Sequence, residues 1–209
     1  MSAGKHGLFI TLEGVEGVGK STAAAQLADL LRADGLDVLL TREPGGTKAA
    51  EAIRQLLLEP DLPMAPLAQT LLHFAARADH VEQHIRPALE RGKIVICDRF
   101  YDSTMAYQAY GQGVALADIE ALIHVIRLTP DVTFLLDLPE KQAAQRLAAR
   151  GKATDRYEEM GQGFFNRVRA GFGAMAMAEP NRFVRIDASP PAHEVVATLR
   201  QTIFKRFGR

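Results

Sequence analysis

Cysteine and long apolar segments are the scarcest features of this sequence. Its single cysteine, Cys97, excludes an internal disulfide and is typical of a reducing compartment. It lies in the apolar run KIVIC, which favours a buried strand position over a redox role. No apolar run is long enough to cross a bilayer, and the first residues, MSAGKHG, lack the apolar core of a signal peptide. We therefore expect a soluble, cytoplasmic protein with no membrane partner.

The sequence also has no surplus of charge. Its 25 basic and 25 acidic side chains balance, whereas domains that bind a nucleic-acid backbone usually carry a basic excess. This balance predicts no polymeric nucleic-acid partner and confines any anion binding to a local site. The 209 residues, 47% of them hydrophobic, suffice for one well-buried core. We expect a single domain over residues 1–209.

Short apolar runs alternate with longer amphipathic segments along the chain. Continuously apolar strands separated by helices are typical of a parallel sheet covered on both faces. The strands are predicted at residues 7–13, 36–41, 93–98, 131–138 and 182–188. The helices are predicted at residues 21–33, 45–58, 66–92, 117–126, 139–150, 164–178 and 191–207. The pattern predicts a three-layer α/β/α domain around a five-stranded parallel sheet.

The stretch GVEGVGKS satisfies the phosphate-loop (P-loop) pattern G-x-x-x-x-G-K-[ST]. Glycines let the backbone curl so that successive N–H groups point at an anion, and the helix that follows adds the positive end of its dipole. The lysine can bridge the outer phosphates, and the serine hydroxyl can hold Mg²⁺. The predicted cradle for nucleotide phosphates consists of Gly14, Val15, Glu16, Gly17, Val18, Gly19, Lys20 and Ser21.

The phosphate loop alone does not separate a GTPase, a motor ATPase and a small-molecule kinase. The N-K-x-D motif that reads guanine is absent, and KIVICDRF ends in Asp98–Arg99 instead of the Asp-Glu of a motor ATPase. Asp98, at the carboxyl end of a strand, can organise Mg²⁺ through water, and Arg99 adds a cation where two phosphate groups meet. The alternative is that both are solvated residues at a strand end.

Several stretches together resemble one enzyme family. FITLEGVEGVGKST, TREPGGT, FAARADH, DRFYDSTMAYQ and ARGKATDRYE occur in the order seen in thymidylate (dTMP) kinases. The chain resembles the bacterial subtype, in which the phosphate loop carries an acidic residue, here Glu16, and the catalytic arginine comes from a lid. The resemblance implies a homodimer that converts ATP and dTMP into ADP and dTDP with Mg²⁺, supplying dTTP for DNA synthesis.

The resemblance also implies a role for each matching residue. Cations should converge on the phosphoryl group during transfer. Arg42 would touch the acceptor phosphate, Arg54 would be a second acceptor-site arginine, and Glu16 would face the sugar. On sequence alone, Arg42 is also compatible with a surface arginine before a turn. The implied catalytic set consists of Lys20, Arg42, Arg99 and Arg150.

A pocket for the pyrimidine base follows from the same resemblance. Arg77 matches the residue that hydrogen-bonds the base. The family usually has a stacking aromatic residue four positions earlier, one helical turn away. Here that position holds His73, so either His73 stacks on the base or the helix presents Phe74, and the spacing favours His73. The set implied to bind dTMP is Glu16, Arg42, Arg54, His73, Phe74, Arg77, Arg99, Thr104, Tyr107 and Gln108.

The polar run ARGKATDRYEEMGQG predicts a small helical lid over about residues 146–163. Its glycine at position 151 suits a segment that closes over ATP and excludes water. Arg150 matches the family's catalytic lid residue, with Arg146 and Arg156 as further lid arginines. The alternative is a group of solvated charges at a helix end.

Two other functions remain open on sequence alone. A kinase for AMP, CMP or a nucleoside would need a base pocket different from the set Arg77, Tyr107 and Gln108. A catalytically silent nucleotide sensor would be expected to lack one of the catalytic residues, all of which are present. The loop that holds Arg42 contains the Glu43–Pro44 peptide, which proline restrains and which can be cis or trans.

Overall fold

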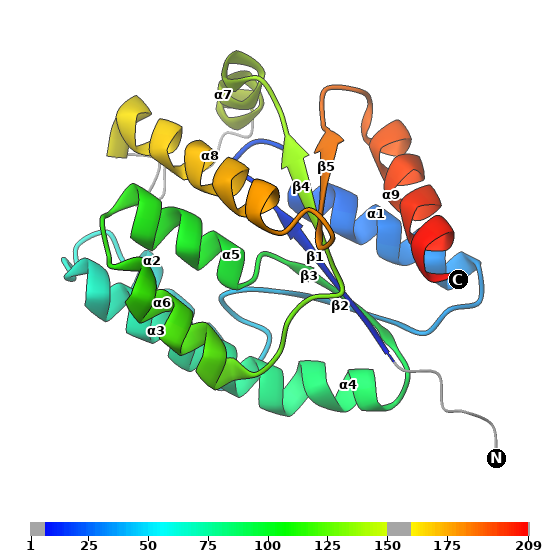
Figure 1. Cartoon of the computed structure of the whole chain (residues 1–209), viewed down its shortest axis with the longest axis horizontal. Coiled ribbons are helices and arrows are strands. Elements are labelled where there is room, and N and C mark those ends of the chain that lie inside the picture. The colour runs from blue at the N-terminus through cyan, green and yellow to red at the C-terminus, as the bar shows by residue number, and fades with distance from the viewer. Residues whose placement is uncertain (1–6, 150–159, 209) are drawn as a thin grey trace.

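The computed structural model describes residues 7–149 and 160–208. A five-stranded sheet lies at its centre with the strand order β2-β3-β1-β4-β5, and every neighbouring pair is parallel (Figure 1). The strands are β1 (Leu8–Glu13), β2 (Val38–Arg42), β3 (Ile94–Asp98), β4 (Val132–Asp137) and β5 (Phe183–Asp187). The five predicted strands and the parallel sheet are confirmed.

Helices cover both faces of the sheet. The helices α1 (Lys20–Ala33) and α9 (Ala192–Phe207) lie together on one face, and α7 (Glu140–Ala149) follows β4 at the top of Figure 1. The layer on the other face consists of α2 (Lys48–Leu58), α3 (Pro66–His80), η1 (Val81–Ile85), α4 (Arg86–Glu90), α5 (Tyr101–Thr104), η2 (Met105–Gly111), α6 (Leu116–Ile126) and α8 (Gly161–Ala178). This arrangement confirms the three predicted layers.

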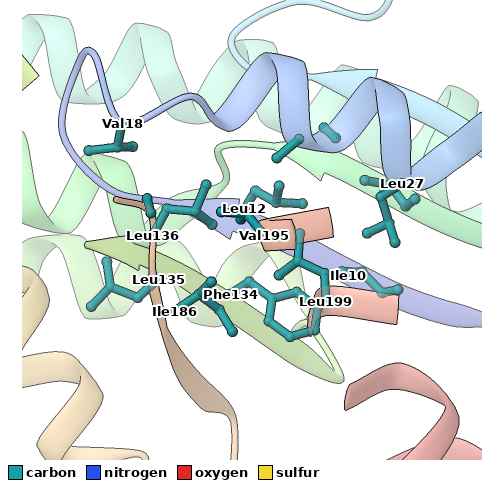
Figure 2. Packing of buried hydrophobic residues seen from close by; sticks show 14 of the residues in the cluster. Ile10, Leu12, Val18, Leu27, Phe134, Leu135, Leu136, Ile186, Val195 and Leu199 are labelled. Carbon is teal, nitrogen blue, oxygen red and sulfur yellow. The ribbon is translucent and has the colours of Figure 1, made fainter. Parts of the chain in front are cut away.

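The core explains why the strands are almost continuously apolar. Ile10 and Leu12 of β1 pack with Leu27 of α1 and Leu199 of α9 on one face of the sheet (Figure 2). Phe9, directly before Ile10 in sequence, belongs to a second cluster on the other face. Because successive side chains of a strand point to opposite faces, a strand covered on both sides must be apolar at nearly every position.

The parallel arrangement brings the ends of three strands to one edge. Arg42 at the end of β2 pairs in register with Asp98 at the end of β3, and Asp98 pairs with Leu12 of β1. The strands β2 and β3 lie on one side of β1, and β4 and β5 lie on the other, so the direction of the strand order reverses at β1. In open α/β sheets, ligands bind outside the carboxyl ends of the strands at such a point.

Two segments of the helical layer differ from the prediction. The single helix expected over residues 66–92 is α3, a π-helical turn η1, and α4 in succession. Arg86 N–H bonds to the carbonyl of Val81, five residues back, just before Pro87. Proline lacks an N–H and clashes with the carbonyl four residues back, and the wider turn relieves this conflict. The helical segments α5 and η2 were not predicted, since YDSTMAYQAYG has no clear apolar period.

A buried ion pair joins the residue before β5 to helix α5. The guanidinium of Arg182, just before β5, donates two hydrogen bonds to Asp102 of α5, at 2.6 and 2.9 Å. It also donates to Thr133 of β4 and to Glu179. The side chains of Arg182 and Asp102 are only 8% and 1% exposed.

We expect the substitution Arg182→Met to lower the free energy of unfolding by about 3–5 kcal/mol, because it leaves the carboxylate of Asp102 buried without its partner. Denaturant unfolding at neutral pH measures the change. The matched control is Arg200→Met, which removes an arginine from a pair on the surface with Asp34 and should change stability little. Equal effects of the two substitutions would contradict the structural role of the Arg182 pair.

Candidate active site

A cavity of about 550 Å³ opens at the carboxyl edge of the sheet, and the phosphate loop forms one of its walls. Gly14, Gly17 and Gly19 have φ values of 135°, 79° and 95°. A side chain at Gly14 would also approach the carbonyl oxygen of Leu136 to 2.5 Å. Only glycine tolerates both conditions. The loop therefore curls against β4, and α1 begins at Lys20 with its amino end toward the cavity.

Apart from Gly14, the residues of the predicted cradle divide into two groups. Glu16, Gly17, Gly19, Lys20 and Ser21 line the cavity. The side chains of Val15 and Val18 lie in the hydrophobic core, which anchors the loop to the sheet.

Lys20 is folded back onto the loop. Its Nζ donates to the carbonyl oxygens of Gly14 and Val15, at 2.9 and 2.8 Å. Burial, aided by the positive charge of Arg99, lowers the pKa of Lys20 to about 8. The ammonium group is thus desolvated and held at the cradle, where an anion would raise its pKa again.

Ser21 and Asp98, the two residues predicted to bind Mg²⁺, contact each other. Ser21 Oγ donates to Asp98 Oδ2 at 2.5 Å, and Asp98 Oδ1 is buried with no hydrogen-bond partner among the described residues. The described residues contain no group of three or more His, Cys, Asp or Glu side chains that could hold a metal. Mg²⁺ usually binds through one or two protein oxygens, water and substrate phosphates. The pair fits that kind of site.

Arg99 lies at the centre of the cavity wall. Its Nη2 donates to Glu16 Oε1 at 2.7 Å, and its Nη1 donates to the carbonyl of Gly14 and to Ser103 Oγ. Its guanidinium also lies over the ring of Tyr107, 5.2 Å from the ring centre. These contacts join the end of β3 to the phosphate loop and to η2.

Glu16 holds Arg99 and Tyr107 together. Tyr107 donates its hydroxyl to Glu16 Oε2 at 2.5 Å. Burial raises the pKa of the Glu16 carboxyl, but the charges of Arg99 and Lys20 and the hydrogen bond from Tyr107 outweigh it and keep the pKa below its usual value. Glu16 is therefore an anion that balances the surrounding cations.

Arg77 of α3 is held on several sides. Its Nε donates to Glu43 Oε2 at 2.7 Å, and its Nη2 donates to Thr104 Oγ1 at 3.1 Å. The rings of Phe74 and Phe100 lie 4.7 and 5.1 Å from its guanidinium carbon. The remaining Nη1 is buried and has no hydrogen-bond partner among the described residues. Since Arg77 lines the cavity, this arrangement suits a donor aimed at a ligand acceptor.

The two candidates for stacking lie in different surroundings. His73 lines the cavity, whereas Phe74 is 4% exposed and packs in the core beneath Arg77. Burial and the charges of Arg77, Arg99 and Arg54 lower the pKa of His73 to about 3, so its ring is neutral near pH 7. Thr104, Tyr107 and Gln108 also line the cavity, as expected of a base pocket.

Arg42 and Arg54 reach the cavity from β2 and α2. Arg42 Nη2 donates to both carboxylate oxygens of Glu51, at 3.0 Å, and its side chain is 53% exposed. Arg54 Nη1 donates to the carbonyl of Pro44 at 2.9 Å. Burial, with the charge of Arg42, lowers the pKa of Arg54. Both arginines lie on the same side of the cavity.

Sequence reasoning missed Glu43 and His80, which support Arg77. Glu43 is buried and accepts from Arg77 with one oxygen, while its other oxygen lies 3.0 Å from His80 Nδ1. His80 Nε2 lies 2.8 Å from Thr41 Oγ1. A signal was present in TREPGG, where Glu43 follows Arg42 at the carboxyl end of a predicted strand, the edge at which ligands bind. The Glu43–Pro44 peptide is cis.

The predicted lid falls only partly within the described residues. Arg146 of α7 lines the cavity beside the phosphate loop, 3.9 Å from where a side chain on Gly19 would begin. Arg150 and Arg156 lie outside the described residues.

Comparison with known proteins gives one family. The thymidylate kinase family model matches residues 12–199. A thymidylate kinase of Gluconobacter oxydans (strain 621H) is 53% identical over 205 residues, which are 96% of this chain and 95% of that protein. A thymidylate kinase of Pseudomonas fluorescens (strain Pf-5) is 53% identical over 196 residues, covering 92% and 93%. A crystal structure of thymidylate kinase from Ehrlichia chaffeensis has a TM-score of 0.78 and 33% identity, covering 94% of this chain and 98% of that one. The chain therefore belongs to the thymidylate kinase family.

Proposed function

We propose that this chain transfers the γ-phosphoryl group of ATP to dTMP, giving ADP and dTDP, and that the cavity described above is its active site. The observation that carries the proposal is that one cavity holds both the phosphate loop with Lys20 and the constrained guanidinium of Arg77. Membership of the thymidylate kinase family supports the same reaction.

The cations of the cavity account for the chemistry of transfer. Phosphoryl transfer passes through a loose transition state, so catalysis depends on positioning and on positive charge near the moving group. Lys20 and Arg99 lie at the phosphate loop, and Arg42 and Arg54 line the same cavity from β2 and α2, where the acceptor phosphate would bind. Each cation in this proposal reaches the substrates from a different element, which fixes the line of transfer.

Ser21 and Asp98 would hold Mg²⁺, the second through water. Bound there with ATP, the ion would neutralise charge on the phosphate oxygens. The buried, unpartnered Oδ1 of Asp98 is the feature that supports this assignment.

For the acceptor, we assign the base to the pocket between Arg77 and His73. Arg77 Nη1 would donate to a carbonyl oxygen of the pyrimidine, and the neutral ring of His73 would stack on it. Tyr107, held by Glu16, would close over the sugar together with Thr104 and Gln108.

The expected homodimer is also part of the proposal. Leu56 of α2 and Leu67 and Leu71 of α3 are 48%, 47% and 50% exposed, and these two helices pack together. Leucines gathered in this way favour a protein interface. The described residues include no helix able to span a membrane.

The proposal is tested by measuring ADP production from ATP with dTMP, dUMP, dCMP and AMP in parallel. We expect the highest kcat/KM with dTMP, because the pocket presents a fixed donor to the base. A higher kcat/KM with AMP or dCMP would overturn the assignment of the acceptor.

The substitution Arg77→Lys tests the base pocket. Lysine keeps a positive charge for Glu43 but loses the guanidinium fork, so we expect KM for dTMP to rise by about ten- to a hundred-fold, the worth of a hydrogen bond from a charged donor. KM for ATP should change less than about two-fold. Arg86→Lys, an arginine on the same helical layer that pairs with Glu82 on the surface, is the matched control. Equal changes in both KM values would make Arg77 a structural residue.

We further propose that the segment over about residues 146–163 is a lid and that Arg150 supplies its catalytic cation. An arginine delivered in this way is worth about 10³–10⁵ in rate in other phosphoryl transferases. The substitution Arg150→Ala should therefore lower kcat at least about a hundred-fold with little change in dTMP affinity. Lys141→Ala, on the exposed side of α7, should leave kcat unchanged. If Arg150→Ala stays within about three-fold of the wild type, Arg156 becomes the next candidate.

A further inference from the structure

Glu13 is a buried carboxylate that the proposed reaction does not explain. It is the last residue of β1, directly before the phosphate loop, and its exposure is 0%. It forms no ion pair among the described residues. Its two oxygens accept hydrogen bonds from Phe100 N–H at 2.7 Å and from Ser103 Oγ at 2.6 Å. Phe100 directly follows Arg99 in the chain, and Ser103 Oγ contacts the Arg99 guanidinium.

The backbone of Arg99 needs such support. Its φ is 70°, in the left-handed region that non-glycine residues rarely adopt. Its N–H bonds to the carbonyl of Leu12 at 3.0 Å, and the next N–H, that of Phe100, bonds to Glu13. The end of β1 therefore holds both peptide N–H groups of this turn.

Glu13 also orients the side chain of Arg99. Because Ser103 donates its only hydroxyl proton to Glu13, its oxygen is left to accept from Arg99 Nη1, at 2.9 Å. The guanidinium is thus fixed by Glu16 on one side and by the Glu13–Ser103 pair on the other.

Stability does not account for Glu13. Burial, with the nearby negative charge of Asp102, raises the pKa of Glu13 to about 8. A buried carboxylate without a paired cation is unfavourable, and a neutral side chain of the same size would remove that penalty. The ionised carboxylate accepts from both donors with two proton-free oxygens and so sets the direction of the Ser103 hydroxyl, whereas an amide or the protonated carboxyl has only one such oxygen.

We propose that Glu13 is a positioning residue for phosphoryl transfer, which acts through Phe100 N–H and Ser103 Oγ to hold Arg99 toward the phosphates of the two substrates. The inference rests on the proposed function, because it takes the role of Arg99 from that reaction.

The substitution Glu13→Gln tests it with almost no change in volume. Its amide can accept from Phe100 but must donate to Ser103, so the hydroxyl proton loses its acceptor and Ser103 Oγ has to accept from the amide as well as from Arg99, which shifts the position of the guanidinium. At a pH above the Glu13 pKa of about 8, where the wild-type carboxyl is ionised, we expect kcat for ATP and dTMP to fall at least about ten-fold, since small misplacements of catalytic groups have large effects on rate. KM for ATP should change less than about two-fold, and the midpoint of thermal unfolding should not fall.

Two further variants, Ser103→Ala and the double variant with Glu13→Gln and Ser103→Ala, test whether Glu13 acts on Arg99 through Ser103 or independently of it. If Glu13 acts through Ser103, the loss of kcat in the double variant should about equal the larger single loss. The matched control is Asp131→Asn. Asp131 accepts from a backbone N–H, that of Phe9, also at 2.7 Å, but it lies just before β4 at the opposite edge of the sheet. Its kcat should stay within about two-fold of the wild type.

Three results would overturn the inference. They are a Glu13→Gln variant with kcat within about two-fold of the wild type, a variant that does not fold or whose unfolding midpoint falls by several degrees, and single losses of kcat that multiply in the double variant. A wild type that does not phosphorylate dTMP would instead overturn the proposed function. If the wild type phosphorylates dTMP and the Glu13→Gln variant has the same kcat, only this inference is overturned.

Discussion

Mutual repulsion among the cations that share one cavity is the constraint on which the site depends. Three arginines are each held by one carboxylate, and each carboxylate belongs to a different part of the chain. Arg99 pairs with Glu16 of the phosphate loop, Arg77 with Glu43 after β2, and Arg42 with Glu51 of α2. Lys20 uses backbone carbonyls of the loop instead. The cations are thereby fixed in place before substrate charge enters, which is the condition for electrostatic catalysis without reorganisation.

The strength of this support varies across the cavity. The pair of Arg77 and Glu43 is 2% exposed on both sides, and the pair of Arg99 and Glu16 is 20% and 13% exposed. The pair of Arg42 and Glu51 is much more open, at 53% and 40%. Buried pairs hold a single geometry, whereas exposed pairs contribute little energy and exchange readily with solvent. This gradient would give the proposed base pocket a rigid geometry and the proposed acceptor-phosphate site a more adaptable one.

The helices beside the cavity are interrupted by wide π-helical turns. The helical layer on this face of the sheet contains two π-helical turns, η1 and η2, and only the second lines the cavity, with Tyr107 and Gln108. In η2, Gln112 N–H bonds to the carbonyl of Tyr107, five residues back. Turns of this width are rare and occur often at functional sites. Here the turn lies where α8 packs against η2, with the rings of Phe164 and Phe172 near that of Tyr107.

Much of the fold and of the cradle could be predicted from the sequence by itself, for local reasons. Continuous apolar runs between amphipathic segments predict a covered parallel sheet, and the phosphate loop requires glycine at positions such as Gly14 and Gly19, where φ is positive. The carboxyl ends of parallel strands share an edge, so Asp98 and Arg42 could be placed together before any coordinates were known.

Only the tertiary structure decided how those residues are held. The contacts of Glu13 with Phe100 and Ser103, and of Glu43 with Arg77, join positions 87, 90 and 34 residues apart. No local pattern records such pairings, because they depend on strand order, on the left-handed turn at Arg99 and on which side of each strand end a carboxylate points. The choice between His73 and Phe74 has the same origin. Neighbours in a helix point about 100° apart, and the packing of α3 against the sheet placed Phe74 in the core and His73 at the cavity.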